Sequence, residues 1–498
     1  MTFTVLDGII VVAYLGGIAL FGIVMGGRQR SARDYFVSER AMPWWAVCLT
    51  IVATETSAIT FLSLPGIAYS GSMVFLQLAL GYIAGRVLVA IFLIPRYFDD
   101  GIATAYSLLE RKFSPTVRRA ASGVFMLTRL FADGVRLYTT AIPLALIVDG
   151  FGVFPDASPT LIYLASMTLL TLLTLVYVFY GGIRAVIWTD VVQWGIYILG
   201  AVVSLVVIFQ LLPQTPAEAL SQLAVNGTLD VFRWVPDGGW SAILRDPYST
   251  IAAVLGGMVL SMASHGTDQL IVQRVLASGS TAAARKAMVM SGIVVFVQFA
   301  AFLLVGALLS LHYPDDAYSA NEVFSVFILH ELPEGMTGLV IAGIFAAAMS
   351  TLSSSISALS SASTMDLLIP LRKSPIDDAT ALRLSRNISL LWALVLLAVA
   401  AVFIETPSTV VELALSIASY TYGGLLALFI LHLLPLRLRA SAAAISFFTG
   451  IVANGIFILF TPLAWTWYTL SGTILTMVFS LLVNMRRRTA THDAGALP

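Results

Sequence analysis

The chain has 498 residues, of which 59% are apolar and 11% are charged, and its mean hydropathy is +0.92. Soluble domains carry roughly 25% charged residues, so this composition excludes an ordinary soluble protein and predicts an all-α polytopic membrane protein. The zero net charge gives no sign of a nucleic-acid partner, the single cysteine excludes an internal disulfide, and the lack of a P-loop motif argues against an ATP-driven pump.

The apolar runs that are long enough to cross the hydrocarbon, about 20 residues each, number about thirteen. Their approximate limits, in chain order, are 5–25, 44–66, 74–95, 120–148, 161–179, 185–212, 250–272, 288–312, 336–362, 386–404, 409–434, 442–461 and 466–485. The first run carries Asp7, has no basic segment before it and is followed by Arg28 and Arg30. We therefore expect it to be a membrane helix and not a cleaved signal peptide.

Positive charges are distributed unevenly between the loops. Most of the 27 Lys and Arg residues fall into every second loop, from Arg28 to Arg488, whereas the other loops hold only Arg233 and Arg245. Because cytoplasmic loops retain Lys and Arg, this bias predicts that the N-terminus lies outside and the C-terminus inside. An odd number of spans requires the same arrangement.

Two spans contain polar stretches that an unbroken membrane helix would lack. The second has five polar residues within Ala53–Thr60 and then Pro65-Gly66, and the seventh has Gly256-Gly257 followed by the polar stretch Ser261–Gln269. These spans open two successive units of five, and an odd number of spans inverts the second unit. We therefore expect an inverted repeat whose broken helices frame a site at the midplane. The alternative is that Pro and Gly merely kink ordinary helices.

This organisation divides the chain into five parts. They are an extra N-terminal helix with a cytoplasmic loop (1–43), the first repeat (44–212), an outer loop (213–249), the second repeat (250–434) and two accessory helices with a cytoplasmic tail (435–498). The outer loop contains the sequon Asn226-Gly227-Thr228, a pattern that is common by chance.

A run of hydroxyl residues interrupts the apolar segment 338–356. Ala347, Ser350, Thr351 and Ser354 stand at i, i+3, i+4 and i+7, so they share one face of a helix. Neutral, hard oxygen ligands suit a weakly bound alkali cation better than a transition metal. The alternative is that small residues ease helix packing while the hydroxyls bond back to carbonyls one turn earlier.

Charged residues inside the spans indicate a polar interior, because charge facing lipid is costly. Arg129, Asp133 and Arg136 share one face of the fourth span, and Glu55 lies in the interrupted second span. The structural interpretation of the row is an internally paired network. Two arginines and one aspartate leave an excess positive charge in this row. Two further roles therefore stay open for Arg136: binding a substrate carboxylate, or pairing with Glu55.

Two other polar residues within the spans are harder to assign. Arg86 has no evident partner in the sequence, and we expect a structural role for it. His265 has a side chain that can sense protons, but its place in Ser-His-Gly-Thr-Asp-Gln favours a hydrogen bond at the helix break.

Three stretches resemble the sodium/solute symporter family, which includes sodium–glucose, proline, iodide, pantothenate and sialic-acid transporters. They are Gly181–Gln193, the motif Thr267-Asp268-Gln269 with Gln273-Arg274, and Ala347–Ser354. The resemblance covers about 5–485 and implies a leucine-transporter-type 5+5 inverted repeat with a leading extra helix. It also implies Na⁺-coupled uptake of a small polar organic solute across the plasma (inner) membrane.

The resemblance also implies where sodium binds. The main site of the family falls on the backbone carbonyls of Ala53, Thr56 and Ala347 and on the side chains of Ser350 and Thr351. The first two belong to the interrupted second span and the other three to the hydroxyl-rich run. A cation at this position would therefore join the two segments.

Some family members similar to sialic-acid transporters have a second sodium site. The residues that match it here are Asp190, Ser350, Ser353 and Ser354, so the resemblance allows one or two Na⁺ per cycle. The alternative is that Asp190 is a structural tie to the hydroxyl-rich helix.

The resemblance places the substrate beside the break in the second span. The residues that match are Glu55, Ser57, Thr60, Gln77 and Arg136. Glu55 departs from the hydroxyl pattern of sialic-acid transporters, which argues against sialic acid itself. A neutral sugar, a sugar acid and a small monocarboxylate all suit the set, while Glu55 alone would suit a polyol or an amine.

We expect a transporter that works as a monomer and is not an enzyme. The alternatives from other classes are a sensor or receptor with a transporter core, a channel and a membrane-embedded hydrolase. No appended signalling domain, repeated pore loop or nucleophile elbow is visible in the sequence to support them.

Overall fold

The structure is a computed structural model that describes residues 3–39, 41–98, 102–150, 157–234, 238–314, 317–404, 410–436 and 438–493. In these ranges the chain forms helices and loops and no strand. The α-helices are α1 (Val5–Gly26), α2 (Ala32–Val37), α3 (Trp44–Glu55), α4 (Ala58–Tyr69), α5 (Leu76–Phe92), α6 (Ile94–Phe98), α7 (Ser107–Lys112), α8 (Pro115–Gly150), α9 (Pro159–Leu211), α10 (Pro216–Val225), α11 (Thr250–Gly266), α12 (Gln269–Ala277), α13 (Thr281–His312), α14 (Val323–His330), α15 (Met336–Ser361), α16 (Asp378–Val402), α17 (Val410–Leu433), α18 (Ala440–Phe460) and α19 (Tyr468–Asp493).

The described helices confirm the expected class of protein. Eight of them are long and apolar enough to cross a membrane, and two strongly bent pairs raise the number to ten. Because only helices and closed barrels satisfy their backbone groups inside lipid, the chain is an all-helical, multi-pass membrane protein.

The two interrupted spans predicted from the sequence are broken helices. α3 and α4 are inclined by 67°, and α11 and α12 by 61°. The first break follows Glu55, and Ser57 caps α4 by accepting a hydrogen bond from the backbone of Thr60. The second break follows Gly266, and Asp268 caps α12 by accepting a hydrogen bond of 2.8 Å from the Leu270 amide. Capping side chains thus replace the hydrogen bonds that the breaks interrupt.

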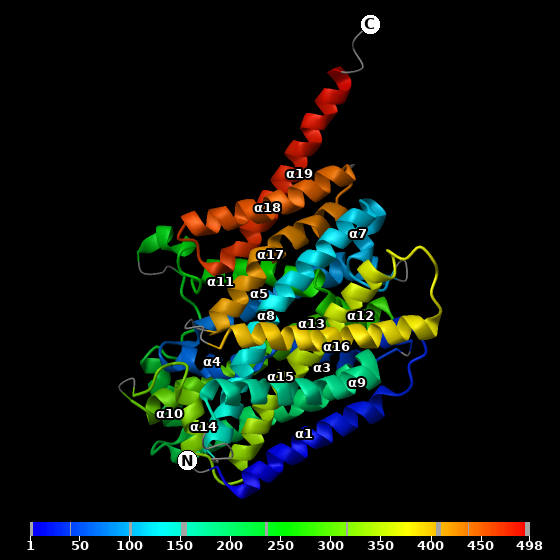
Figure 1. Cartoon of the computed structure of the whole chain (residues 1–498). Helices are drawn as coiled ribbons and strands as arrows, with labels where there is room; N and C mark the ends of the chain where they lie inside the picture. The colour runs from blue at the N-terminus through cyan, green and yellow to red at the C-terminus, as the bar shows by residue number, and fades with distance from the viewer. Residues whose placement is uncertain are drawn as a thin grey trace.

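Helix α15 forms the centre of the bundle. Every residue from Val340 to Ser361 is buried, and the helix packs against α9, α1, α8 and α3 (Figure 1). At its N-terminal end the buried Asp7 of α1 accepts hydrogen bonds of 2.8 and 2.7 Å from the amides of Gly335 and Gly338. This carboxylate satisfies amides at the start of α15 and fixes the position of that end against α1.

Helix α9 is too long to be a single span. Its 53 residues would extend about 80 Å at 1.5 Å per residue, against about 30 Å of hydrocarbon. Gly182 interrupts it with a φ of +56°, and a Cβ atom there would lie 2.6 Å from the Tyr35 carbonyl oxygen. Only glycine tolerates both the conformation and the close contact, so Gly182 separates two apolar segments.

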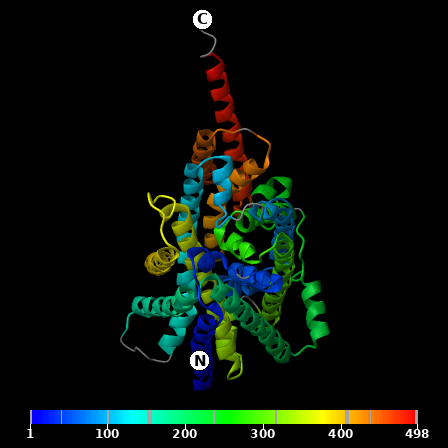
Figure 2. The ribbon, with the colours of Figure 1, turned by 90° about the vertical axis from the view of Figure 1, so that its right-hand side faces the viewer.

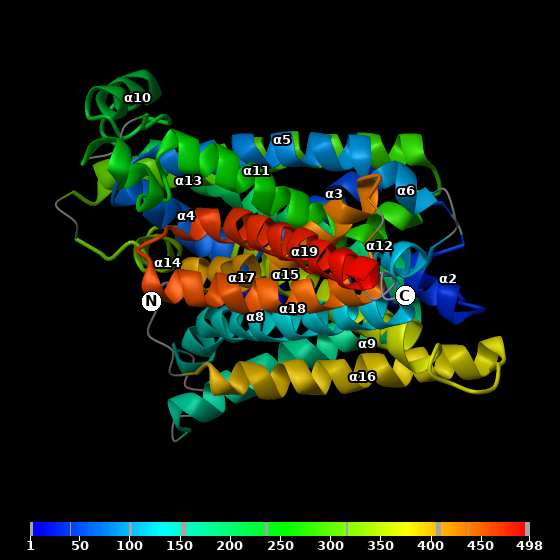
Figure 3. The same ribbon diagram turned by 90° about the horizontal axis from the view of Figure 1, so that it is seen from above.

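The connecting elements separate into two ends of the bundle. The N-terminus, α10 and α14 lie at one end, and the C-terminus, α2 and α6 lie at the other (Figure 3). Helix α19 projects beyond the other helices toward the C-terminus (Figure 2). Chain ends on opposite sides agree with an odd number of crossings.

Glycines allow α5 and α11 to pack closely, which gives a direct test of the fold. A Cβ atom on Gly85 would lie 2.3 Å from the Met258 carbonyl oxygen, whereas one on Gly195 of α9 would meet nothing within 4 Å. We expect Gly85→Ala to destabilise the protein by about 1–3 kcal/mol through overpacking, measured as a lower melting temperature in detergent. The matched control, Gly195→Ala, should melt at or above the temperature of the unmodified protein, and equal melting of both variants would contradict this packing.

Candidate sodium and substrate sites

The short helix α12 carries the polar groups that connect the broken span to the centre of the bundle. All nine of its residues are buried. Gln269 donates a hydrogen bond of 3.1 Å to Ser361, and Gln273 donates one of 3.0 Å to Ser357. Gln269 and Gln273 are four residues apart, as are Ser357 and Ser361, so the two hydrogen bonds join α12 and α15 at positions one helical turn apart. The motif that carries the family resemblance therefore fixes α12 against α15.

The buried carboxylate of Asp190, on α9, is fully paired with groups from other helices. It accepts hydrogen bonds from Ser350 at 2.6 Å, from Thr50 and from the Arg274 guanidinium at 3.2 Å. Arg274 is itself fully buried and also donates to Ser354. The guanidinium of α12 therefore lies between Asp190 and Ser354, two residues of the predicted second sodium site.

Four of the five predicted main sodium ligands come together at the break between α3 and α4. Ala53 and Thr56 line a small cavity with Ala347 and Ser350 of α15. Thr351 donates a hydrogen bond of 3.1 Å to the Ala347 carbonyl, so it does not line the cavity but places its oxygen beside a predicted ligand. Uncharged carbonyl and hydroxyl oxygens from two helices can bind an alkali cation.

The same cavity has a lining residue that the sequence analysis did not select. Gln193 of α9 lies there, and neither polar atom of its buried amide has a hydrogen-bond partner in the described part of the chain. A buried amide without a partner costs about 1–3 kcal/mol, which a bound cation or a water at the amide oxygen would offset. The sequence did contain a signal for this residue, because Gln193 is the last residue of Gly181–Gln193, one of the three stretches that carry the family resemblance.

The packing interpretation of the hydroxyl run also has support. Ser354 and Ser355 donate hydrogen bonds of 2.7 and 2.9 Å to the carbonyls of Ser350 and Thr351, one turn earlier. Ser355 has one hydroxyl hydrogen, so the bond to Thr351 competes with its bond to Asp133, and the Ser354 oxygen already accepts from Arg274. Back-bonding and cation binding are compatible at Thr351, whose hydroxyl donates to the Ala347 carbonyl and keeps its oxygen lone pairs.

A larger cavity of about 100 Å³ lies on the other side of the α3–α4 break. Four of the five predicted substrate residues line it, namely Glu55, Ser57, Thr60 and Arg136. Further lining residues come from several helices, and they are Thr54, Leu64, Phe75, Tyr82, Arg129, Leu260, Ser264, His265, Leu270, Ile271, Phe299 and Tyr422. The cavity is thus lined by both apolar and polar side chains, and the polar ones can orient a solute.

The expectation that Gln77 lines the substrate site is wrong for this structure. Its side chain is fully buried, and its amide nitrogen donates hydrogen bonds of 3.0 Å to the carbonyls of Val74 and Tyr248. Gln77 therefore holds the start of α5 against the loop before α11. The sequence placed it within a few residues of the cavity, which Phe75 reaches instead.

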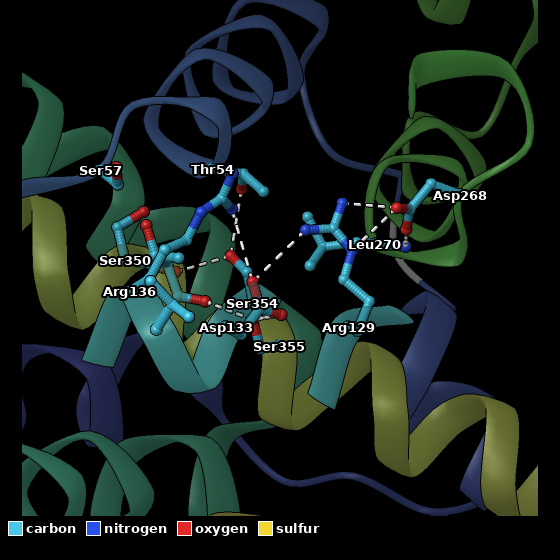
Figure 4. A network of polar contacts seen from close by, with 12 residues as sticks. Thr54, Ser57, Arg129, Asp133, Arg136, Asp268, Leu270, Ser350, Ser354 and Ser355 are labelled. Carbon is cyan, nitrogen blue, oxygen red and sulfur yellow. Dashed lines mark hydrogen bonds and ion pairs between the residues drawn. The ribbon is translucent and has the colours of Figure 1, made fainter. Parts of the chain in front are cut away.

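The row of charges on α8 forms the internally paired network expected from the sequence (Figure 4). Asp133 lies 3.4 Å from both Arg129 and Arg136, and it accepts a hydrogen bond of 2.6 Å from Ser355. The sequence reasoning missed Asp268 of α12, which accepts a hydrogen bond of 2.8 Å from Arg129. Asp268 compensates Arg129, so Arg136 keeps only the long contact with Asp133 among the described residues.

Glu55 is neutralised by a different arginine from the one considered in the sequence analysis. Its carboxylate pairs with Arg86 of α5, which also donates a hydrogen bond of 2.8 Å to Ser291. The alternative that Arg136 pairs with Glu55 is therefore wrong here. His265 has Nδ1 2.9 Å from the Ser264 hydroxyl, which confirms the expected hydrogen bond at the end of α11.

A multi-pass helical protein with two broken spans around small polar cavities belongs to the class of secondary transporters. Comparison with known proteins agrees. Residues 35–450 match the model of the Sodium:solute symporter family. The chain is 28% identical over 493 residues to the sodium/sialic acid symporter NanT of Aliivibrio fischeri, which covers 97% of this chain and 93% of that protein.

Two further matches extend the comparison. The human sodium-coupled monocarboxylate transporter 1 is 25% identical over 462 residues, which cover 90% of this chain and 72% of that protein. A solved structure of a Na⁺-coupled sialic acid symporter in its substrate-bound, outward-open state matches with a TM-score of 0.84 at 24% identity. That match covers 97% of this chain and 98% of the other, and it shows a shared fold.

The chain belongs to the sodium:solute symporter family. It is a Na⁺-coupled solute symporter and not an enzyme. The family match explains why the three stretches quoted from the sequence converge around α15, because each contributes to the two cavities or to their support.

The Asp190–Arg274 pair gives a test of the site that does not depend on transport. Removing one partner of a buried ion pair leaves an uncompensated charge and costs about 3–5 kcal/mol. In Na⁺-free buffer, we expect Arg274→Met to lower the melting temperature strongly when Asp190 is present. The same substitution made in the Asp190→Asn variant should lower it far less. A coupling energy of about 0.5–3 kcal/mol from this cycle supports the pair, whereas additive effects of the two substitutions would contradict it.

Proposed function

We propose that the chain imports a small polar organic solute together with Na⁺ by alternating access across the plasma (inner) membrane. The solute is a sugar, a sugar acid or a monocarboxylate. The single observation that supports this most strongly is the convergence of Ala53 and Thr56 from the broken α3–α4 span with Ala347 and Ser350 of α15. Sodium at this point contacts both the broken span and the central helix.

The proposed coupling follows from the position of the break. The backbone that supplies Ala53 and Thr56 to sodium also carries Glu55 and Ser57, which line the solute cavity. Sodium binding orders this segment and thereby prepares the solute site in the outward-facing state. By linkage, Na⁺ and solute must raise each other's affinity by the same factor. When the inward-facing state separates α3 from α15, the sodium ligands part and Na⁺ leaves.

We further propose thirteen spans, arranged as a leucine-transporter-type 5+5 repeat with one leading and two following helices. The eight long apolar helices and the two bent pairs supply ten. Dividing α9 at Gly182 adds one, and α8 and α17 complete the number. On this proposal the repeats occupy 44–212 and 250–434, the N-terminus lies outside, and a monomer contains the complete pathway.

The proposed solute contacts are Glu55, Ser57, Thr60 and Arg136. Arg136 has a planar, bidentate donor set for a carboxylate, and its one contact in the described chain, to Asp133, is long at 3.4 Å. Sialic acid and monocarboxylates, named for two of the related transporters, both carry a carboxylate. The neutral-sugar alternative would use Ser57 and Thr60 alone and leave Arg136 to the α8 network.

A second Na⁺ is also proposed, at Asp190, Ser350, Ser353 and Ser354. Arg274 competes with it, because its guanidinium lies between Asp190 and Ser354. A cation enters this position only when α12 withdraws the guanidinium. The number of Na⁺ carried per solute is therefore set by the position of Arg274.

The main sodium site can be tested by removing one hydroxyl from it. We expect Thr351→Ala to raise the half-saturating Na⁺ concentration for uptake into proteoliposomes at least tenfold, about 1.4 kcal/mol, with normal protein yield. Thr351→Ser retains the hydroxyl and should preserve the Na⁺ dependence. Ser360→Ala is a matched control, because Ser360 lies on the same buried helix and, among the described residues, its hydroxyl bonds only to the Ile356 carbonyl.

The outcome also separates the proposal from its alternatives. Na⁺-driven accumulation of solute against its gradient distinguishes a symporter from a channel or a sensor. Uptake and solute affinity that do not respond to Na⁺ in the unmodified protein would refute the coupling. Loss of folded protein in Thr351→Ala but not in Ser360→Ala would favour a packing role for the hydroxyl.

The second sodium site predicts a change of stoichiometry. We expect Ser353→Ala to lower the Na⁺:solute ratio from two to one, measured from the reversal potential of transport in proteoliposomes. Ser360→Ala should leave the ratio unchanged. A ratio of one in the unmodified protein would show that Arg274 keeps this position closed to Na⁺ throughout the cycle.

A further inference from the structure

The solute cavity has a cluster of polar groups around Glu55 that neither the family match nor the proposed sodium sites require. Glu55 ends α3, His265 lies near the end of α11, and Arg86 comes from α5. Arg86 is fully buried and pairs with Oε2 of Glu55, and its second nitrogen donates to Ser291. Glu55 and His265 both line the cavity, whereas Arg86 lies behind them.

His265 has one ring nitrogen without a partner. Its side chain is only 3% exposed, and Nε2 has no hydrogen-bond partner among the described residues. This nitrogen lies 3.7 Å from Oε2 of Glu55, beyond hydrogen-bond distance. No described group donates to the other oxygen of Glu55, Oε1. Nε2 of His265 and Oε1 of Glu55 thus have no hydrogen bond within the described residues, although the two side chains lie within ion-pair distance of each other.

The tautomer of His265 follows from its neighbours. Nδ1 lies 2.9 Å from the Ser264 hydroxyl, which can donate to it. A neutral imidazole then carries its proton on Nε2. That hydrogen faces the carboxylate of Glu55, which is the favourable orientation, whereas a lone pair there would repel the negative charge.

A ligand group that satisfies both residues must donate to Glu55 and accept from His265. An alcohol hydroxyl does both, because it has one donor hydrogen and two lone pairs. An ammonium group only donates, so it would leave the Nε2–H unsatisfied. It would also approach Arg86, whose charge already compensates Glu55. An unsubstituted alkyl chain would leave both groups without partners, at a cost of about 1–3 kcal/mol each.

We propose that Glu55 and His265 form a hydroxyl-selective subsite, and that the transported solute is a small hydroxylated monocarboxylate. The hydroxyl donates to Glu55 and accepts from His265, and the carboxylate binds Arg136 within the same cavity. The apolar side chains of Leu260 and Phe299 contact the carbon chain between these groups. The inference rests on the proposed function, since it assigns the solute of that transporter.

A matched ligand series tests the subsite in the unmodified protein. For each chain length from three to six carbons, the probes are the unsubstituted monocarboxylate, the ω-hydroxy acid and the ω-amino acid. The readouts are the ligand-induced thermal shift in Na⁺-containing and Na⁺-free buffer, and competition for uptake in proteoliposomes. At one or more chain lengths we expect the hydroxy acid to bind at least tenfold more tightly than both analogues.

Variants of His265 then test which residue confers the preference. His265→Phe removes the donor and should reduce hydroxy-acid affinity at least tenfold while the affinity for the unsubstituted acid stays constant. His265→Gln restores an N–H donor and should recover part of the preference. Ser360→Ala serves as the unaffected control, and the Na⁺-induced thermal shift reports that each variant is folded.

The outcomes separate this inference from the proposed function. A protein that is stabilised by Na⁺ but binds unsubstituted or amino acids as tightly as hydroxy acids at every length overturns the hydroxyl subsite alone. An equal hydroxyl preference in His265→Phe and the unmodified protein also overturns it. A protein that shows no Na⁺-dependent binding or uptake of any probed acid or sugar would instead refute the proposed function.

Discussion

The bilayer supplies no water to a broken helix, so every backbone group freed by a break must find a partner within the protein. The break between α11 and α12 shows how strictly this constraint acts. Asp268 caps α12, accepts from Arg129 and also accepts from Tyr422. The two glutamines of α12 then bond to serines of α15. The polar partners that permit the break therefore also fix α12 against the helix that carries the hydroxyl run.

The break between α3 and α4 has the opposite character, because its free groups face the two cavities. Ser57 caps α4 locally, while Ala53 and Thr56 line the small cavity and Glu55 lines the large one. The end of α3 and the two residues that follow it thus border both proposed ligand sites. Coupling in this arrangement needs no long relay through the protein, since ordering the segment for one ligand positions it for the other.

The sequence predicted features that depend on local pattern. The long apolar runs, the two broken spans and the shared face of Ala347, Ser350 and Thr351 follow from composition and helical spacing. The pairing of charges did not follow, because it depends on how distant helices are aligned. Glu55 meets Arg86 on α5, and Arg129 meets a carboxylate 139 residues away. The direction of the Gln77 side chain, away from the cavity, could not be predicted for the same reason. A shift of one or two positions around a helix decides what a side chain faces.

The charged face of α8 has a consequence for the order in which the chain can be assembled. Three ionised side chains near the middle of one helix oppose its entry into lipid by about 2.5–3.5 kcal/mol each on the insertion scale. The carboxylate that compensates Arg129 belongs to a segment synthesised 139 residues later. Full compensation of the charge on α8 therefore requires α12, which is synthesised later. Biogenesis of the first half of this protein is completed by the second.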